Sequence, residues 1–133
     1  MDLLSVLPRH PRASDHIYIA EGLDSIPAFG FAPGHHIQTP YQLHLPQTFP
    51  SDFAIRATVR PDRPEGGYLF AVVDPYDTIV ELGVEIGPGS KPSYSNVSLI
   101  YSDLRRDRKS KTIASFPVPD SVGSWMQFAL MIK

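Results

Sequence analysis

The sequence predicts an all-β protein, folded as an antiparallel β-sandwich or jelly roll. Short segments in which apolar and polar residues alternate recur about every dozen residues, which is typical of strands in such folds. The 14 prolines and 9 glycines fall between these segments, where all-β chains place their turns. No segment carries the apolar period of a long helix.

The N-terminal third gives only weak signals. Residues 2–7 fit one helical turn, which Pro8 ends. Short strands are expected at residues 17–19 and 41–45, and the stretch between them is rich in glycine and proline.

The clearest strands lie further along the chain. Residues 53–60 alternate strictly, which places Arg56 and Arg60 on the polar face. Residues 68–73 are apolar on both faces, which predicts a central strand, and Asp74 begins the turn that follows.

Three more strands are expected, at residues 80–86, 96–101 and 112–118, before a last strand at 125–132. Their apolar phase predicts the core: Phe53, Ile55, Leu69, Ala71, Leu82, Val84, Leu99, Phe128 and Leu130.

Length and composition exclude several classes of function. A chain of 133 residues is expected to form a single domain over residues 1–133. The net charge of -2 gives no global attraction to nucleic acid or to anionic membranes. No apolar run approaches the roughly 20 residues that cross a bilayer. The lack of cysteine removes disulfides and thiolate nucleophiles.

The carboxylates do not form a catalytic pair. Glu81 and Glu85 lie in one predicted strand, about 13 Å apart at 3.3 Å per residue. Glycoside hydrolases need carboxyl groups about 5–9.5 Å apart. No hydrolase or metalloprotease motif occurs. We therefore expect no enzymatic activity and no cofactor.

Two places were considered for a metal ion. Neighbouring side chains of an extended segment point to opposite sides, so His35 and His36 are poorly placed to share zinc. Asp74 and Asp77 provide few of the six to eight oxygens that calcium prefers. We expect Asp74 to organise its own turn, and no metal site is predicted.

A glycosylation sequon and a basic cluster stand out. Asn96 begins the sequon Asn-Val-Ser on the polar phase of its strand. Five basic residues lie within seven positions of each other, offset only by Asp103 and Asp107. This basic segment consists of Arg105, Arg106, Arg108, Lys109 and Lys111.

The basic segment has two interpretations. Guanidinium groups suit sulfate as they suit phosphate, so the segment is a candidate heparin-binding site. The alternative is a solvated hairpin loop whose charges prevent edge pairing. Charge density leaves both open, whereas nucleic acid is disfavoured because no aromatic residues interleave the basic ones.

The order of several short segments resembles a known domain. Residues 49–55 (FPSDFAI), 66–72 (GGYLFAV) and 125–130 (WMQFAL) are similar to the thrombospondin N-terminal-like, or laminin-G-like, domain. Residues 80–84 (VELGV) and 114–119 (ASFPVP) are similar to its version in the multiplexin collagens, types XV and XVIII. The resemblance covers nearly the whole chain.

The resemblance implies a concanavalin-like sandwich in a secreted extracellular-matrix protein, whose parent chain would be a collagen trimer. It implies adhesion or matrix organisation, with heparan sulfate as one expected partner. The family's domain continues past the tryptophan strand, so residues 1–133 are expected to lack the last strands. The family has a short neutral loop at the basic segment, so binding there is not inherited from these relatives.

Two alternatives remain open. A lectin-like sandwich would bind neutral sugars through Tyr76, Tyr94 or Tyr101. A structural spacer would bind no ligand. Binding to sulfate weakens steeply with salt, whereas binding to a neutral sugar hardly changes.

Overall fold

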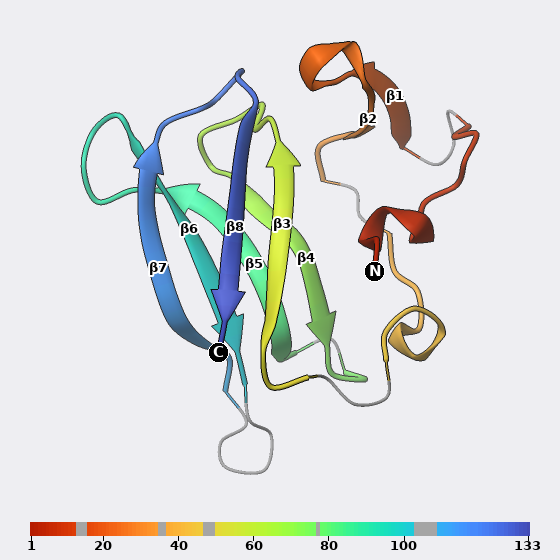
Figure 1. Ribbon diagram of the computed structural model, residues 1–133, viewed down its shortest axis with the longest axis vertical. Coiled ribbons are helices and arrows are strands. Elements are labelled where there is room, and N and C mark those ends of the chain that lie inside the picture. The colour runs from red at the N-terminus through yellow and green to blue at the C-terminus, as the bar shows by residue number, and fades with distance from the viewer. Residues whose placement is uncertain (13–15, 35–36, 47–49, 77, 103–108) are drawn as a thin grey trace. The chain divides into compact units, whose positions relative to one another are not determined.

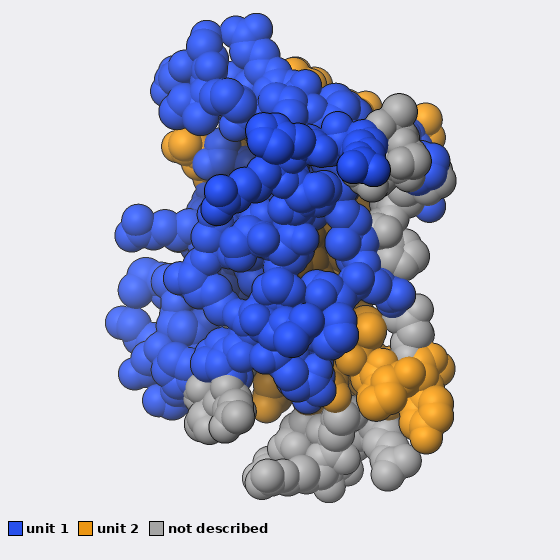
Figure 2. Space-filling model, turned by 90° about the vertical axis from the view of Figure 1, so that its right-hand side faces the viewer, with its two compact units in different colours: residues 1–58, 128–133 blue, residues 59–127 orange. Residues whose placement is uncertain are grey.

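A computed structural model describes residues 1–12, 16–34, 37–46, 50–76, 78–102 and 109–133 (Figure 1). These residues form antiparallel strands and short 3-10 turns, which confirms the predicted all-β class and is consistent with a β-sandwich. No helix in these ranges is long and apolar enough to cross a membrane. The chain divides into two compact units, Met1–Thr58 with Phe128–Lys133, and Val59–Gln127 (Figure 2).

The first unit begins with the predicted helical turn, which is the 3-10 turn η1 (Leu3–Val6). The Asp2 carboxylate accepts a hydrogen bond from the Leu4 N–H at 2.9 Å and so caps this turn. A hairpin of β1 (Ile17–Glu21) and β2 (Pro27–Phe31) follows, joined through the 3-10 turn η3 (Leu23–Ser25).

The prediction of a strand at residues 41–45 is wrong, because this stretch contains the 3-10 turn η4 (Tyr41–Leu43). The Leu43 N–H donates to the Pro40 carbonyl and the His44 N–H to the Tyr41 carbonyl. These local bonds occupy backbone groups that a strand would offer to a neighbour.

Strands β3 (Phe53–Val59) and β8 (Met126–Ile132) pair in a sheet of their own. Their arrows run in opposite directions in Figure 1, so the pair is antiparallel. Burial alternates along both strands, with Phe53 and Ile55 less exposed than Arg56. The predicted phase of both strands is confirmed.

The second unit contains a four-stranded antiparallel meander of successive strands. They are β4 (Gly67–Val73), β5 (Val80–Pro88), β6 (Tyr94–Tyr101) and β7 (Lys111–Pro119). Because β5 and β6 lie in the middle, they hold the most buried side chains, Val84 at 0% and Val97 at 1% exposure. Strand β4 was expected to be central and instead forms an edge.

The predicted burial of Leu69 and Ala71 was also wrong. Tyr68 pairs with Glu85 and Phe70 with Val84, so Leu69 is an extra residue in a β-bulge. The bulge moves Phe70 onto the face of Val84 and leaves Leu69 38% exposed. Ala71 pairs with Gly83 on the other face and is exposed as well. The other predicted core residues are buried or partly buried.

Shortening a buried side chain at the centre of the meander should lower the free energy of unfolding. Val97→Ala removes two buried methyl groups and leaves a cavity, so we expect a loss of about 2 kcal/mol in the free energy of unfolding. Urea denaturation followed by tryptophan fluorescence measures it. Val122→Ala is the matched control, because Val122 is 37% exposed in a loop, and it should change stability by less than about 0.5 kcal/mol. Equal losses for the two variants would contradict the core described here.

Candidate functional site

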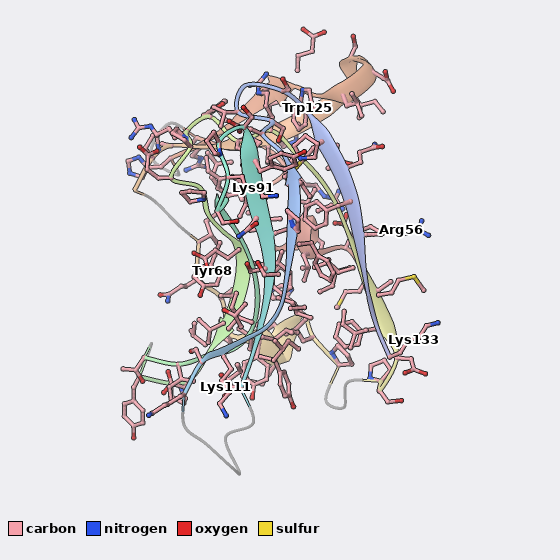
Figure 3. The ribbon with its side chains drawn as sticks, turned by 90° about the vertical axis from the view of Figure 1, so that its left-hand side faces the viewer. Arg56, Tyr68, Lys91, Lys111, Trp125 and Lys133 are labelled. Carbon is pink, nitrogen blue, oxygen red and sulfur yellow. The ribbon has the colours of Figure 1, made fainter. Side chains whose placement is uncertain are left out.

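The basic segment is partly described. Arg105, Arg106 and Arg108 lie outside the described residues. Lys109 and Lys111 are exposed, and Lys111 begins β7, near the lower end of the view in Figure 3. The described lysines are therefore open to solvent, as binding to a polyanion requires.

Two serines flank residues 103–109, which contain most of the basic segment, and both bond to the backbone of β5. Ser102 is only 6% exposed, and its hydroxyl donates to the Val80 carbonyl at 2.7 Å. Its N–H donates to the Glu81 carbonyl at 3.0 Å. On the other side the Ser110 hydroxyl accepts from the Val80 N–H at 2.8 Å. Ser102 and Ser110 are thus both attached to the start of β5.

Sequence reasoning did not single out Ser102 and Ser110. The sequence marks these two serines only by their position, one on each side of the charged residues 103–109. Their hydrogen bonds attach Ser102, just after β6, and Ser110, just before β7, to β5.

Arg56 and Arg60, on the polar phase of residues 53–60, are further basic residues outside the basic segment. The Arg60 guanidinium carbon lies 5.3 Å from the centroid of the Trp125 ring, in a cation–π contact. Its Nε is also 3.8 Å from an Asp62 carboxylate oxygen. Arg60 is therefore already engaged within the second unit, whereas Arg56 is exposed on β3.

The predicted turn at Asp74 is confirmed. One carboxylate oxygen accepts from the Thr78 N–H at 2.7 Å and from the Ile79 N–H at 2.9 Å. The other accepts from the Thr78 hydroxyl at 2.8 Å. These bonds favour the ionised carboxylate, chiefly the one from the Ile79 N–H, and hold the pKa of Asp74 below its usual range.

Metal binding has no support within the described ranges, where no group of three His, Cys, Asp or Glu side chains could hold an ion. His35, His36 and Asp77 lie outside these ranges. Glu81 and Glu85 are partly exposed residues of β5.

Asn96 lies on β6 and is partly exposed. It pairs with Gly87 on β5 and with Pro117 on β7, on the face opposite Val97. A Cβ placed on Gly87 would meet no atom within 4 Å, so the space beside Asn96 is open. The predicted outward phase of Asn96 is confirmed.

The tyrosines of the lectin-like alternative are all exposed, Tyr76 at 83%, Tyr94 at 46% and Tyr101 at 50%. Tyr94 and Tyr101 occupy opposite ends of β6, about 23 Å apart at 3.3 Å per residue. Their odd separation also places them on opposite faces of the strand. The structure therefore does not unite these two in one sugar site.

Comparison with known proteins finds a relative among the matrix collagens. The chain is 31% identical over 105 residues to the human collagen alpha-1(XVIII) chain. The match covers 79% of this chain and 6% of that relative. No family model matches the chain, and no solved structure gives a significant match. The identity confirms the resemblance to a multiplexin collagen.

The Asp74 turn should make stability depend on pH. Asp74→Asn removes the charge that the two N–H groups and the Thr78 hydroxyl stabilise, so the variant should be less stable at pH 7. Because the pKa of Asp74 is lowered by folding, its contribution is present above the unfolded value of about 3.9. It is lost as the pH falls through the folded pKa.

Urea unfolding of the wild type and of Asp74→Asn tests this dependence, from pH 7 down to the lowest pH at which both are folded. The stability gap should narrow as the pH falls below about 4. Asp52→Asn, at an exposed position before β3, is the charge-matched control and should show little gap at any pH. A gap for Asp74→Asn that stays constant with pH would exclude the carboxylate's charge as its cause.

Proposed function

We propose that this chain, which is similar to a segment of a multiplexin collagen, is a non-catalytic module of an extracellular-matrix collagen. The observation that carries the proposal is the 31% identity over 79% of the chain. The antiparallel all-β fold agrees with a laminin-G-like module over residues 1–133. A secreted parent chain that trimerises through a collagen helix follows from the same similarity.

The parent transcript tests the collagen assignment directly. The segment encoded after residue 133 should contain a Gly-X-Y repeat, because only glycine fits at the axis of a collagen triple helix. A parent sequence without such a repeat would contradict the collagen assignment, and the chain would then be a β module of another kind of protein.

The module's proposed ligand is heparan sulfate, bound by the basic segment. Five cationic side chains lie within seven positions there, so their charges add locally although the whole chain carries -2. The Ser102 and Ser110 bonds to Val80 attach the residues on either side of positions 103–109 to β5. Adhesion or matrix organisation would follow from this binding.

Heparin chromatography tests the basic segment. The triple variant Arg105→Glu, Arg106→Glu and Arg108→Glu should lose retention at physiological salt, because released counterions drive polyanion binding. Its melting temperature should stay that of the wild type. The matched control reverses Arg56, Arg63 and Lys91, three exposed residues outside the segment, and changes the net charge equally.

The control variant should elute close to the wild type, and wild-type affinity should fall steeply as salt rises. Co-elution of the wild type and the segment variant would show that the segment is a solvated hairpin. An equal loss for both variants would show that net charge, rather than the segment, governs retention. Binding unaffected by salt would favour the neutral-sugar alternative.

Asn96 is a proposed N-glycosylation site. The sequon, the partial exposure of Asn96 and the open space at Gly87 support it. Protein secreted from eukaryotic cells should carry a glycan on the peptide that contains Asn96, as measured by mass spectrometry. Ser98→Ala keeps Asn96 but removes the sequon, and should abolish the glycan. An unmodified peptide throughout the secreted wild type would refute the site.

A further inference from the structure

A continuous row of side chains crosses all four strands of the meander. Tyr68 on β4 pairs with Glu85 on β5, Glu85 pairs with Ser98 on β6, and Ser98 pairs with Ser115 on β7. Directly paired residues of antiparallel strands point to the same face, so these four side chains form one line, which we call the polar row. At about 4.8 Å between strands, it spans about 14 Å.

The polar row lies on the face opposite Val84 and Val97, and on its own face it borders Ile100, which pairs with Gly83 and is 3% exposed. Its neighbours along the strands, Val84, Val97 and Leu99, point the other way and are at most 6% exposed. Tyr68 is 48% exposed, and Ser115 is exposed too. The two hydroxyls of Ser98 and Ser115 lie 3.0 Å apart and hydrogen-bond to each other. A ligand could therefore reach both the ring and the hydroxyls.

The Tyr68 ring lies close to Gly83, which has no side chain. A Cβ placed on Gly83 would come within 3.0 Å of the Val80 Cγ1 and 3.2 Å of the Tyr68 Cε1, so these two side chains border the space that a larger residue would fill. Figure 3 labels Tyr68 on β4, above Lys111 in the view. An aromatic ring that is about half open to solvent offers a surface for stacking.

The charge at the polar row selects among ligands. Burial and the nearby Glu85 carboxylate raise the pKa of Tyr68, so its phenol stays protonated at neutral pH and keeps a donor. The Glu85 carboxylate oxygens accept hydrogen bonds, and the row has no cationic side chain that would attract an anion. The row thus offers one ring, one carboxylate and two hydroxyls, and it disfavours sulfated or carboxylated ligands.

We infer that the polar row binds a neutral saccharide, with a sugar ring stacked on Tyr68 and its hydroxyls bonded to Glu85, Ser98 and Ser115. A pyranose has an apolar face of C–H groups and a rim of hydroxyls, which matches an aromatic ring beside donors and acceptors. The open space over Gly87, one row away on the same face, leaves room for further sugar units.

This site is distinct from the basic segment. Lys111 pairs with Tyr101 on β6. Tyr101 pairs with Leu82 on β5, and Leu82 pairs with Val72 on β4. Val72 lies four residues from Tyr68 along β4, about 13 Å away. The two sites also differ in charge, so loss of one should leave binding at the other unchanged.

The saccharide has two conceivable sources. It is either the chain's own glycan on Asn96, which lies two residues from Ser98 on the same face, or an oligosaccharide of another molecule. Both present the same chemistry to the polar row, so the experiment is designed to separate them.

The first arm uses the full chain made in bacteria, without glycan. The probe is the free core oligosaccharide of N-linked glycans, built of mannose and N-acetylglucosamine, titrated by calorimetry. We expect binding that changes by less than about twofold between low and high salt, because no net charge is neutralised. Tyr68→Ala should weaken it at least about tenfold, the value of one lost stacking contact of about 1.4 kcal/mol.

Matched variants separate the site from general effects. Tyr76→Ala removes a tyrosine that is 83% exposed in the turn after β4, and it should bind the probe as the wild type does. Glu85→Gln keeps the shape of its side chain and should weaken binding without loss of melting temperature, which keeps the test valid if Tyr68→Ala misfolds. Heparin retention should be the same in all these variants.

The second arm uses protein secreted from eukaryotic cells. If the Asn96 glycan is the natural occupant, the glycosylated chain should not bind the probe, and enzymatic removal of the glycan should restore binding. If the ligand is external, the glycosylated chain should bind the probe as well. The inference is overturned if the unglycosylated wild type does not bind, or if Tyr68→Ala and Glu85→Gln bind as tightly as the wild type.

Discussion

The register between β5 and β6 is the constraint on which the rest of the second unit depends. Val84 pairs with Leu99 and Ile86 with Val97, which brings four buried side chains onto one face. Because side chains alternate along a strand, this pairing also fixes what the other face carries. A slip of one residue would bury Glu85 without a partner and expose the valines, at a cost of several kcal/mol.

The bulge at Leu69 extends this constraint to the edge strand. Tyr68 takes the polar face opposite Glu85, and Phe70, only two residues later, takes the core face opposite Val84. A regular strand places residues two apart on the same face, so the extra residue is needed for both side chains to reach their positions. The small size of Gly83 then allows the Tyr68 ring to lie against the sheet.

The two proposed binding regions of the second unit differ in charge. The basic segment follows β6 along the chain and ends at Lys111 of β7, and Ser102 and Ser110 bind the backbone of Val80. The polar row crosses the strands themselves and contains a carboxylate, Glu85. Cationic side chains suit a sulfated chain, whereas an aromatic ring with a carboxylate and hydroxyls suits a neutral sugar. A matrix module with both would recognise glycans in two ways that respond differently to salt.

The sequence by itself determined the all-β class, the alternating strands, the turn at Asp74 and the outward phase of Asn96, because these follow from local periodicity and turn chemistry. It also determined the resemblance to a collagen module, through segments distributed along the chain. Only the tertiary structure decided that β4 is an edge strand with a bulge, since apolar residues on both faces suit a central strand equally well. The polar row was likewise decided there, because its members lie up to 47 positions apart, from Tyr68 to Ser115, and only strand register brings them together.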